Sequence, residues 1–292
     1  MNVLSLFDGM SCGRIALERA GIKVDNYYAS EIDKYAIKVS EANYPDIIRL
    51  GDVTKIKVDK GRKIDLLIAG SPCQGFSFAG KQLNFDDPRS ALFFEFVRIL
   101  KECRMYNPDV KFLLENVKMK KEYQDVITQY MGCEPVFICS SNFSASKRKR
   151  LYWTNIPSIT EMKQSDEGGV IQDIMDENFS ETSDYLNQKD IDRAIIKHSA
   201  QTLSTGTKMG SVKFPTPMSE KSKCLNTVRI KGDRTMTHVF GKNGIRLLNT
   251  VEYERLQTVP DNYTASVSNS QRYKMLGNGW TVDVIAHIFK NL

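Results

Sequence analysis

An unbroken apolar run that leads into a glycine-flanked turn is the feature that most constrains how this chain folds. Residues 66–69 read Leu-Leu-Ile-Ala, and residues 70–77 read Gly-Ser-Pro-Cys-Gln-Gly-Phe-Ser. Such a run is typical of a buried strand, and α/β proteins bind their ligands where such strands end. Pro72 has no N–H to donate and stiffens the backbone before Cys73. The pattern indicates a thiol presented to a ligand, with packing of Cys73 as a small apolar side chain as the alternative.

Composition limits the classes of protein to which the chain can belong. Its 292 residues are 41% hydrophobic, which is enough for one large domain or two unequal ones. No apolar run approaches the ~20 residues of a membrane span and the first residues lack a cationic leader, so we expect an intracellular protein. The chain has six cysteines without a C-x-x-C pair, and three histidines. The number and spacing of these residues support neither a disulfide framework nor a zinc site, so we expect reduced thiols and no metal.

The chain has a net charge of +6, and its excess of basic side chains is concentrated in two segments. Residues 200–250 carry nine basic side chains against two acidic ones, and residues 147–150 read Lys-Arg-Lys-Arg. A polyanion such as nucleic acid would release counterions on binding to these cations, which favours association. A solvated surface is the alternative interpretation of a charge run.

Carboxylates follow three successive predicted strands near the start of the chain. The strands are expected at residues 3–7, 27–30 and 47–50, and the acids that follow them are Asp8, Glu31 and Asp52. Glu31 stands 23 residues after Asp8, close to the spacing at which an acid reaches a ribose diol in dinucleotide-type folds. The first turn is not G-x-G-x-x-G, however, and Asp8 would repel a pyrophosphate. Together the three acids favour a nucleoside-bearing cation, a description that S-adenosylmethionine fits.

Further along the chain, charged residues accompany three more predicted strands. A strand at residues 110–114 is followed by Glu115, which is costly to bury without a role. A surface carboxylate at the start of the next helix is the alternative. A sixth strand is expected at residues 136–139. Arg148 and Arg150 lead into a seventh strand and, being two residues apart, are expected on one face of it.

Five short motifs, in order along the chain, resemble the signatures of DNA cytosine-5 methyltransferases. They are Phe7-Asp8-Gly9 with Gly13, residues 71–77, Glu115-Asn116-Val117, Arg148-Lys149-Arg150 and Gly277-Asn278-Gly279. The resemblance covers residues 1–158 and 246–292 and is to the bacterial or phage type, with some likeness to the eukaryotic de novo branch. In two places the chain departs from the family pattern. The usual Gln-x-Arg-x-Arg begins here with Ser146, and Lys221 or Lys223 stands for the arginine expected before residues 225–227.

The resemblance implies an α/β fold: a Rossmann-like S-adenosylmethionine-dependent methyltransferase sheet with a smaller, irregular target-recognition domain. We expect a discontinuous catalytic domain of residues 1–157 and 247–292, and a target-recognition domain of residues 158–246. The apolar helix predicted near residues 282–289 should pack beside the first helix and close the large domain.

The family mechanism assigns chemistry to four residues of this chain. Cys73 is expected to attack carbon 6 of cytosine as a thiolate, because carbon 5 is a poor nucleophile until the ring is activated. A protonated Glu115 would relieve charge at N3, a general-acid contribution of about 10²–10⁴ in rate. Arg150 would hold the carbonyl O2, and either Arg148 or Arg150 would lower the pKa of the thiol. The target base must be flipped out of the duplex at a cost of a few kcal/mol.

Further residues are carried over from the family pattern as ligand contacts. Phe7 and Trp280 present aromatic faces that suit a sulfonium cation, while Glu31 is expected at the ribose and Asp52 at the adenine amino group. The residues expected to bind S-adenosylmethionine, and its product S-adenosylhomocysteine, are Phe7, Asp8, Gly9, Gly13, Glu31, Ile32, Asp52, Val53, Pro72, Asn278 and Trp280. Core packing is the alternative for Phe7. The residues expected to contact DNA are Gln74, Ser77, Lys81, Lys208, Arg229, Lys231 and Arg234.

Two other functions are compatible with the same sheet. A tRNA cytosine-5 methyltransferase would use the same Cys73 and Glu115, but the Cys-Phe-Thr tripeptide expected of that branch is absent. A non-catalytic DNA-binding relative would have lost one of the chemical residues. We expect double-stranded DNA as partner, no membrane, and a monomer in the cytoplasm of a bacterial or phage-infected host cell. The sequence leaves open whether a cognate restriction endonuclease accompanies the enzyme.

Overall fold

The computed structural model describes the chain in two compact units. The described residues are 1–71, 88–160, 165, 167–177, 179, 184–205, 214–231, 233 and 235–292. Unit 1 comprises Met1–Cys139, Lys149–Lys163 and Val282–Leu292, and unit 2 comprises Ser140–Arg148 and Gln164–Thr281. Each unit is therefore assembled from segments that are separated in the sequence.

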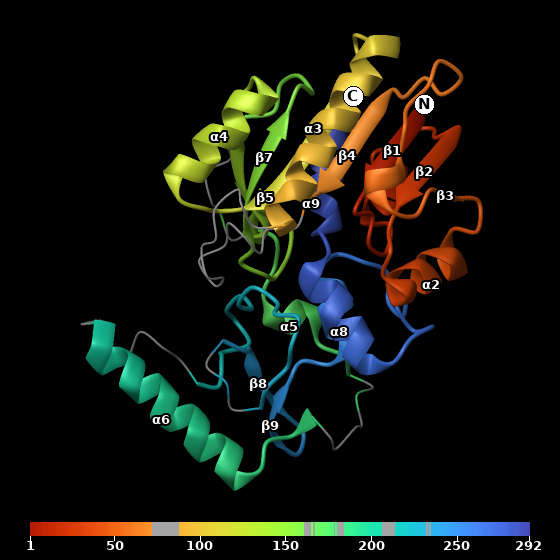
Figure 1. Ribbon diagram of the computed structural model, residues 1–292. Helices are drawn as coiled ribbons and strands as arrows, with labels where there is room; N and C mark the ends of the chain where they lie inside the picture. Colours follow the sequence, from red (N-terminus) through yellow and green to blue (C-terminus); the bar gives the residue numbers. More distant parts are fainter. Residues whose placement is uncertain are drawn as a thin grey trace. The chain divides into compact units, whose positions relative to one another are not determined.

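Unit 1 is built on a sheet whose order, among the described residues, is β3-β2-β1-β4-β5-β7-β6 (Figure 1). The strands are β1 Asn2–Leu6, β2 Asn26–Ser30, β3 Ile48–Arg49, β4 Leu66–Gly70, β5 Lys111–Val117, β6 Val136–Cys139 and β7 Lys149–Thr154. The first five strands are parallel to one another, and β7 runs antiparallel between β5 and β6. The Rossmann-like methyltransferase sheet expected from the sequence is confirmed.

The central strands form because both of their faces are covered. Leu66, Leu67, Ile68 and Ala69 of β4 are all fully buried, which is why the sequence shows a continuous apolar run in place of alternation. Leu67 lies in one core cluster with Phe96 and Phe112. Burial on both sides therefore fixes β4, and with it the point at which the chain leaves the sheet toward Cys73.

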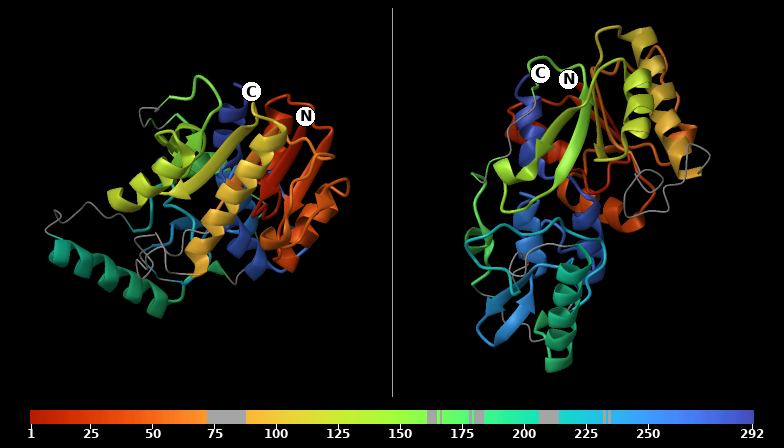
Figure 2. Two further views of the ribbon diagram at one scale, coloured as in Figure 1. Left: turned by 45° about the horizontal axis from the view of Figure 1, so that its top comes forward. Right: turned by 90° about the vertical axis from the view of Figure 1, so that its left-hand side faces the viewer.

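Helices cover the sheet and bring a distant part of the chain into unit 1. They are α1 Cys12–Arg19, α2 Lys34–Asn43, α3 Pro88–Tyr106, α4 Lys121–Met131 and α9 Val282–Phe289, with the short 3-10 helix η1 Val53–Lys55. Helix α9 packs against α1, as the sequence predicted, and Figure 2 shows the dark blue α9 beside the red N-terminal elements. An ion pair of 2.6 Å between Arg19 and Asp283 ties the two helices together.

Unit 2 holds more irregular chain. Its elements are η2 Ser140–Asn142, α5 Ile171–Ile174, α6 Gln188–Thr205, β8 His238–Gly241, β9 Gly244–Leu247, α7 Thr250–Leu256 and α8 Asn269–Asn278. Strands β8 and β9 form an antiparallel hairpin. Within the described ranges, no helix has the length and apolarity that crossing a membrane requires.

The division into units differs from the boundaries expected at residues 157/158 and 246/247. Residues 247–281 and 140–148 cluster with unit 2. The expected boundary at residue 247 would separate Arg246 from Glu252, whose side chains are 3% and 0% exposed and form an ion pair of 2.7 Å. Separating two buried charges is unfavourable, so the segment that follows the hairpin stays with it. A shift in composition along the sequence does not reveal such a pair.

Candidate active site

The parallel strands of unit 1 end at one edge of the sheet, and the predicted site residues follow them there. Phe7 follows β1, Glu31 follows β2, Gly51 and Asp52 follow β3, and Ser71 follows β4. Ligands of open α/β sheets bind at this carboxyl edge. The residues predicted for the site therefore follow strands that end at the edge where folds of this class bind ligands.

The loop after β1 has an unusual backbone. Phe7, Gly9 and Ser11 have φ angles of 56°, 58° and 65°, all in the left-handed region. This conformation is uncommon for a bulky residue such as Phe7, and strained residues of this kind cluster at ligand sites. Phe7 is half-buried and packs against the core, as its alternative interpretation predicted, and its contact with the cofactor stays a prediction. Gly13 is buried in α1.

Glu31 joins the loop after β1 to the start of α2. Its carboxylate accepts hydrogen bonds from the backbone N–H groups of Gly9 (2.8 Å), Ile32 (2.7 Å) and Asp33 (2.8 Å). Ile32 beside it is 76% exposed, which leaves an apolar side chain on the surface at this edge. An exposed isoleucine next to a carboxylate suits a ligand that has both an apolar ring and a hydroxyl-bearing part.

Asp52 begins η1 at the end of β3. Its Oδ1 accepts hydrogen bonds from the Thr54 N–H (3.0 Å) and the Thr54 hydroxyl (2.9 Å). These hydrogen bonds hold the pKa of the Asp52 carboxyl below its usual value, so the group is anionic at neutral pH. Val53 is buried behind it. The acids, the exposed isoleucine and the glycine-containing loop together fit the nucleoside-bearing cation expected from the sequence.

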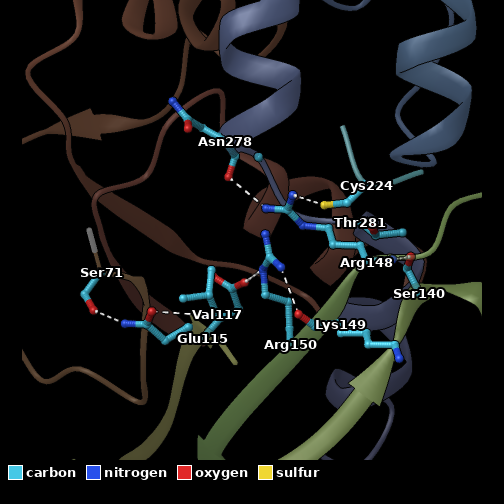
Figure 3. A network of polar contacts seen from close by, with 12 residues as sticks. Ser71, Glu115, Val117, Ser140, Arg148, Lys149, Arg150, Cys224, Asn278 and Thr281 are labelled. Carbon is cyan, nitrogen blue, oxygen red and sulfur yellow. Dashed lines mark hydrogen bonds and ion pairs between the residues drawn. The ribbon is translucent and has the colours of Figure 1, made fainter. Parts of the chain in front are cut away.

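Glu115 and Arg150 form a buried ion pair on neighbouring strands of unit 1 (Figure 3). Arg150 Nε lies 2.7 Å from Glu115 Oε1, and the two side chains are 13% and 9% exposed. Glu115 lies inside β5, which continues to Val117 because it pairs with β7 as far as Arg150. The expectation of a strand that ends before Glu115 is therefore wrong, and so is its alternative of a surface carboxylate.

The same part of β5 is fixed beside the end of β4. Glu115 is paired in register with Gly70, three residues before Cys73. The Asn116 side-chain amide donates to the hydroxyl of Ser71 at 3.1 Å, and both groups are buried. The carboxylate thus lies next to the point from which the chain continues to the predicted nucleophile. Other predicted residues lie outside those that the structure describes: Pro72, Cys73, Gln74, Ser77, Lys81, Lys208 and Arg234.

Arg148 belongs to unit 2 and has different partners from Arg150. Its guanidinium, in a residue only 5% exposed, donates to the carbonyls of Gly277 (3.1 Å) and Asn278 (3.3 Å) and lies 3.7 Å from Cys224 Sγ (Figure 3). These carbonyls are the last of α8, which lack partners within the helix. Arg148 therefore caps α8. The sequence did not predict this role, because Arg148 and Gly277 are 129 positions apart.

Gln257, for which the sequence predicted no role, orders the segment that follows α8. Its amide donates to the carbonyls of Leu276 (2.7 Å) and Gly279 (3.1 Å), and its Oε1 accepts from the Thr281 hydroxyl (2.7 Å). Trp280, half-buried, lies between these last two residues, and Asn278 before them is exposed. The segment predicted to contact the cofactor is thus fixed from both sides.

Two of the cations expected to contact DNA are bound within unit 2. Arg229 forms an ion pair of 2.8 Å with Asp184, donates to the Leu248 carbonyl at 2.8 Å, and lies 4.0 Å from the centre of the Tyr273 ring. Lys231 Nζ donates to the Tyr185 carbonyl at 2.7 Å. Recognition of a base by either side chain would require it to leave these partners.

Comparison with known proteins identifies the chain's relatives. Residues 1–131 and 136–292 match the model of a family described as C-5 cytosine-specific DNA methylase. The type II methyltransferase M.HpaII of Haemophilus parainfluenzae is 31% identical over 97% of this chain and 86% of its own length. M.HhaI of Haemophilus parahaemolyticus, also a type II methyltransferase, is 28% identical over 100% of this chain and 94% of its own.

Solved structures with the same fold include a DNMT2 variant from Spodoptera frugiperda and the methyltransferase EhMeth from Entamoeba histolytica. The first has a TM-score of 0.72 at 20% identity, covering 99% of this chain and 98% of its own. The second has a TM-score of 0.73 at 16% identity, covering 100% and 97%. These likenesses concern the fold. The family match over nearly the whole sequence shows that the chain belongs to the C-5 cytosine-specific DNA methylases, which methylate carbon 5 of cytosine in DNA with S-adenosylmethionine as methyl donor.

Proposed function

We propose that Cys73, Glu115 and Arg150 carry out methyl transfer to a cytosine that is flipped out of duplex DNA. The observation that supports this proposal is the buried Glu115–Arg150 ion pair beside the end of β4. Burial of two charges is expensive and is found where a protein uses them, so the pair is a natural candidate for the groups that contact the base. Its neighbour in the sheet, Gly70, begins the segment that carries Cys73.

The three residues have different roles in the proposed mechanism. The Cys73 thiolate adds to carbon 6 of cytosine and makes carbon 5 nucleophilic. The Glu115 carboxyl, oriented by Arg150 Nε, takes up a proton from solvent as the base binds and donates it toward N3, which offsets the charge that the addition creates. The Arg150 guanidinium also holds O2. Glu31 and Asp52 would hold S-adenosylmethionine, which would supply the methyl group to carbon 5. A water molecule then accepts the carbon-5 proton, the carbon 5–carbon 6 double bond re-forms, and the carbon 6–sulfur bond breaks to release the Cys73 thiolate.

A covalent trap tests this mechanism directly. DNA that carries 5-fluorocytosine at the target should form a stable adduct with the wild-type protein and cofactor, because fluorine cannot leave as a proton does. Cys73→Ala should form no adduct on a denaturing gel, whereas Cys133→Ala, which removes a thiol of unit 1 outside the proposed site, should form as much as the wild type. Methylation by the Cys73→Ala variant would overturn the mechanism.

We also propose that unit 2 recognises the DNA sequence. Its long irregular segments and the cation excess between residues 200 and 250 support this role. Because Arg229 and Lys231 are held by Asp184 and Tyr185, we assign base reading to other side chains of the unit.

The proposal extends to the oligomeric state of the enzyme, its location and its partner. We propose a monomer in the cytoplasm of a bacterial or phage-infected cell, working beside a cognate restriction endonuclease, as the naming of its relatives as type II methyltransferases supports. Light scattering behind a sizing column tests the monomer. Bisulfite sequencing of a naive host that expresses the chain identifies the methylated sequence.

A further inference from the structure

We propose that Asp8, Ser11 and Ser40 form a positioning relay, anchored by Arg49, that sets the shape of the cofactor-binding loop after β1. The inference rests on the proposed function, because it takes the carboxyl edge of unit 1 as the S-adenosylmethionine site. It assigns Asp8, which the sequence suggested as a cofactor contact, to the support of the loop.

The relay is a chain of hydrogen bonds beneath the loop. Asp8 Oδ1 accepts from the Tyr27 hydroxyl at 2.7 Å, and Asp8 Oδ2 accepts from the Ser11 hydroxyl. The Ser11 hydroxyl is also bonded to that of Ser40, and Ser40 Oγ accepts from Arg49 Nη2 at 3.1 Å. Both carboxylate oxygens of Asp8 thus accept from side chains of unit 1.

The two ends of the chain fix the direction of every hydrogen bond in it. A guanidinium only donates and a carboxylate only accepts, so Ser40 must donate to Ser11 and Ser11 to Asp8. Hydrogen bonds aligned in this way between a cation and an anion polarise one another. Ser11 and Ser40 are fully buried, which keeps water from competing with the chain. The relay therefore holds one defined arrangement of the loop.

The position of Ser11 indicates that the relay serves the loop and not the helix. Ser11 is the N-cap of α1, where a serine hydroxyl usually accepts from a backbone N–H of the first turn. Here the Ser11 side chain makes no capping hydrogen bond, and its φ of 65° is left-handed. A stabilising cap is thus absent and the hydroxyl is directed to Asp8 and Ser40. The start of α1 therefore lacks a side-chain cap, while the Ser11 hydroxyl stabilises the loop.

The relay connects two parts of the proposed cofactor site. At one end lies the loop with its left-handed Phe7, Gly9 and Ser11. At the other end Arg49 belongs to β3 and stands three residues before Asp52. Arg49 is itself held by Glu41 at 3.2 Å. A relay of this span couples the end of β1 to the end of β3, so loosening its middle should weaken binding of the cofactor as a whole.

Ser40→Ala is the test, because Ser40 is fully buried in α2 and lies below the loop. We expect the dissociation constant for S-adenosylmethionine, measured by calorimetry without DNA, to rise about 3- to 10-fold, the effect of one lost hydrogen bond. The KM for DNA and the turnover at saturating cofactor should stay at wild-type values. Thr128→Ala is the matched control, since it removes a hydroxyl that accepts from Trp153 Nε1 at 3.0 Å elsewhere in unit 1. That control should bind the cofactor normally.

Two further variants test the relay if Ser40→Ala folds poorly. Arg49→Gln retains a donor but removes the charge, and should raise the same constant by a smaller factor. Asp8→Asn combined with Ser40→Ala should raise it by less than the product of the two single effects, because the residues act as one unit. Equal binding by wild type and all variants would overturn the relay alone, as would an equal loss in Thr128→Ala. Failure of the wild type to bind S-adenosylmethionine would overturn the assignment of the cofactor site and the relay with it.

Discussion

Glu115 and Arg150 illustrate how much of the chemistry is decided by single side chains. Arg150 Nε holds Glu115 Oε1 at 2.7 Å, and both side chains are largely buried between β5 and β7. The residue types and their order in the chain could be predicted from the sequence. Their direct contact could not, because it depends on an antiparallel strand that returns from more than 30 residues away.

Glu115→Gln tests whether this carboxyl acts on the base. Glutamine keeps the shape of the side chain and can still accept from Arg150, but it cannot supply a proton. We expect single-turnover methyl transfer to slow by about 10²- to 10⁴-fold, the usual contribution of a general acid. The dissociation constants for DNA and cofactor should change much less. Parallel losses in rate and in both affinities would instead indicate a structural glutamate.

Arg229→Ala is expected to lower stability and not to alter sequence preference. The guanidinium is held by Asp184 at 2.8 Å and stacks on Tyr273, so its removal leaves a largely buried carboxylate without this partner. We expect a loss of about 2–4 kcal/mol in the free energy of unfolding by urea, somewhat below the cost of breaking a fully buried pair. Methylation of a randomised duplex library should show the wild-type base preference.

Lys242→Ala is the control for this prediction. Lys242 is exposed in the turn between β8 and β9. Its removal should leave stability unchanged and, if the lysine meets a phosphate, reduce the salt slope of DNA binding by about one unit. A changed base preference in Arg229→Ala with normal stability would show that Arg229 reads the DNA after all.

At the scale of elements, α8 is defined by what surrounds its C-terminus. Arg148 caps the carbonyls of Gly277 and Asn278, and Gln257 binds those of Leu276 and Gly279. A side-chain carbon added at Gly277 would lie 2.7 Å from the backbone carbonyl of Asn226 and 2.8 Å from Thr227 N. The glycine is therefore required by close packing of two backbones.

Gly277→Ala should destabilise unit 2 by about 1–3 kcal/mol, because backbone atoms must move to admit the methyl group. Because we propose that Trp280, which follows this helix end, contacts the cofactor, the affinity for S-adenosylmethionine should also fall. Gly132→Ala is the comparison: that glycine ends α4 in a left-handed conformation with open space around it, and its loss should cost about 1 kcal/mol without affecting the cofactor. Wild-type stability and affinity in Gly277→Ala would contradict this account.

The elements that sequence patterns predicted well are those fixed by local burial. The strand predicted at residues 66–69 is β4, and the acids after the predicted strands lie at one edge of the sheet. The compact units divide the chain elsewhere than at the expected boundary of residue 247, because Arg246 and Glu252 are joined by a contact that periodicity does not encode. The hydrogen bonds that Asp8 accepts from Tyr27 and Ser11 could not be predicted for the same reason, since the fold brings these partners together.

For the whole molecule, the order of the segments along the chain has a consequence for its synthesis. Unit 1 begins at residue 1, yet β7 enters the sheet between β5 and β6 only after Ser140–Arg148 has been made, and α9 follows all of unit 2. Domains usually fold as they leave the ribosome, the first one first. During translation the edge of β5 stays unpaired until β7 has been made, and α1 stays uncovered until α9 has been made. The surface of α1 that α9 covers is therefore exposed throughout the translation of unit 2, and exposed apolar surface favours aggregation.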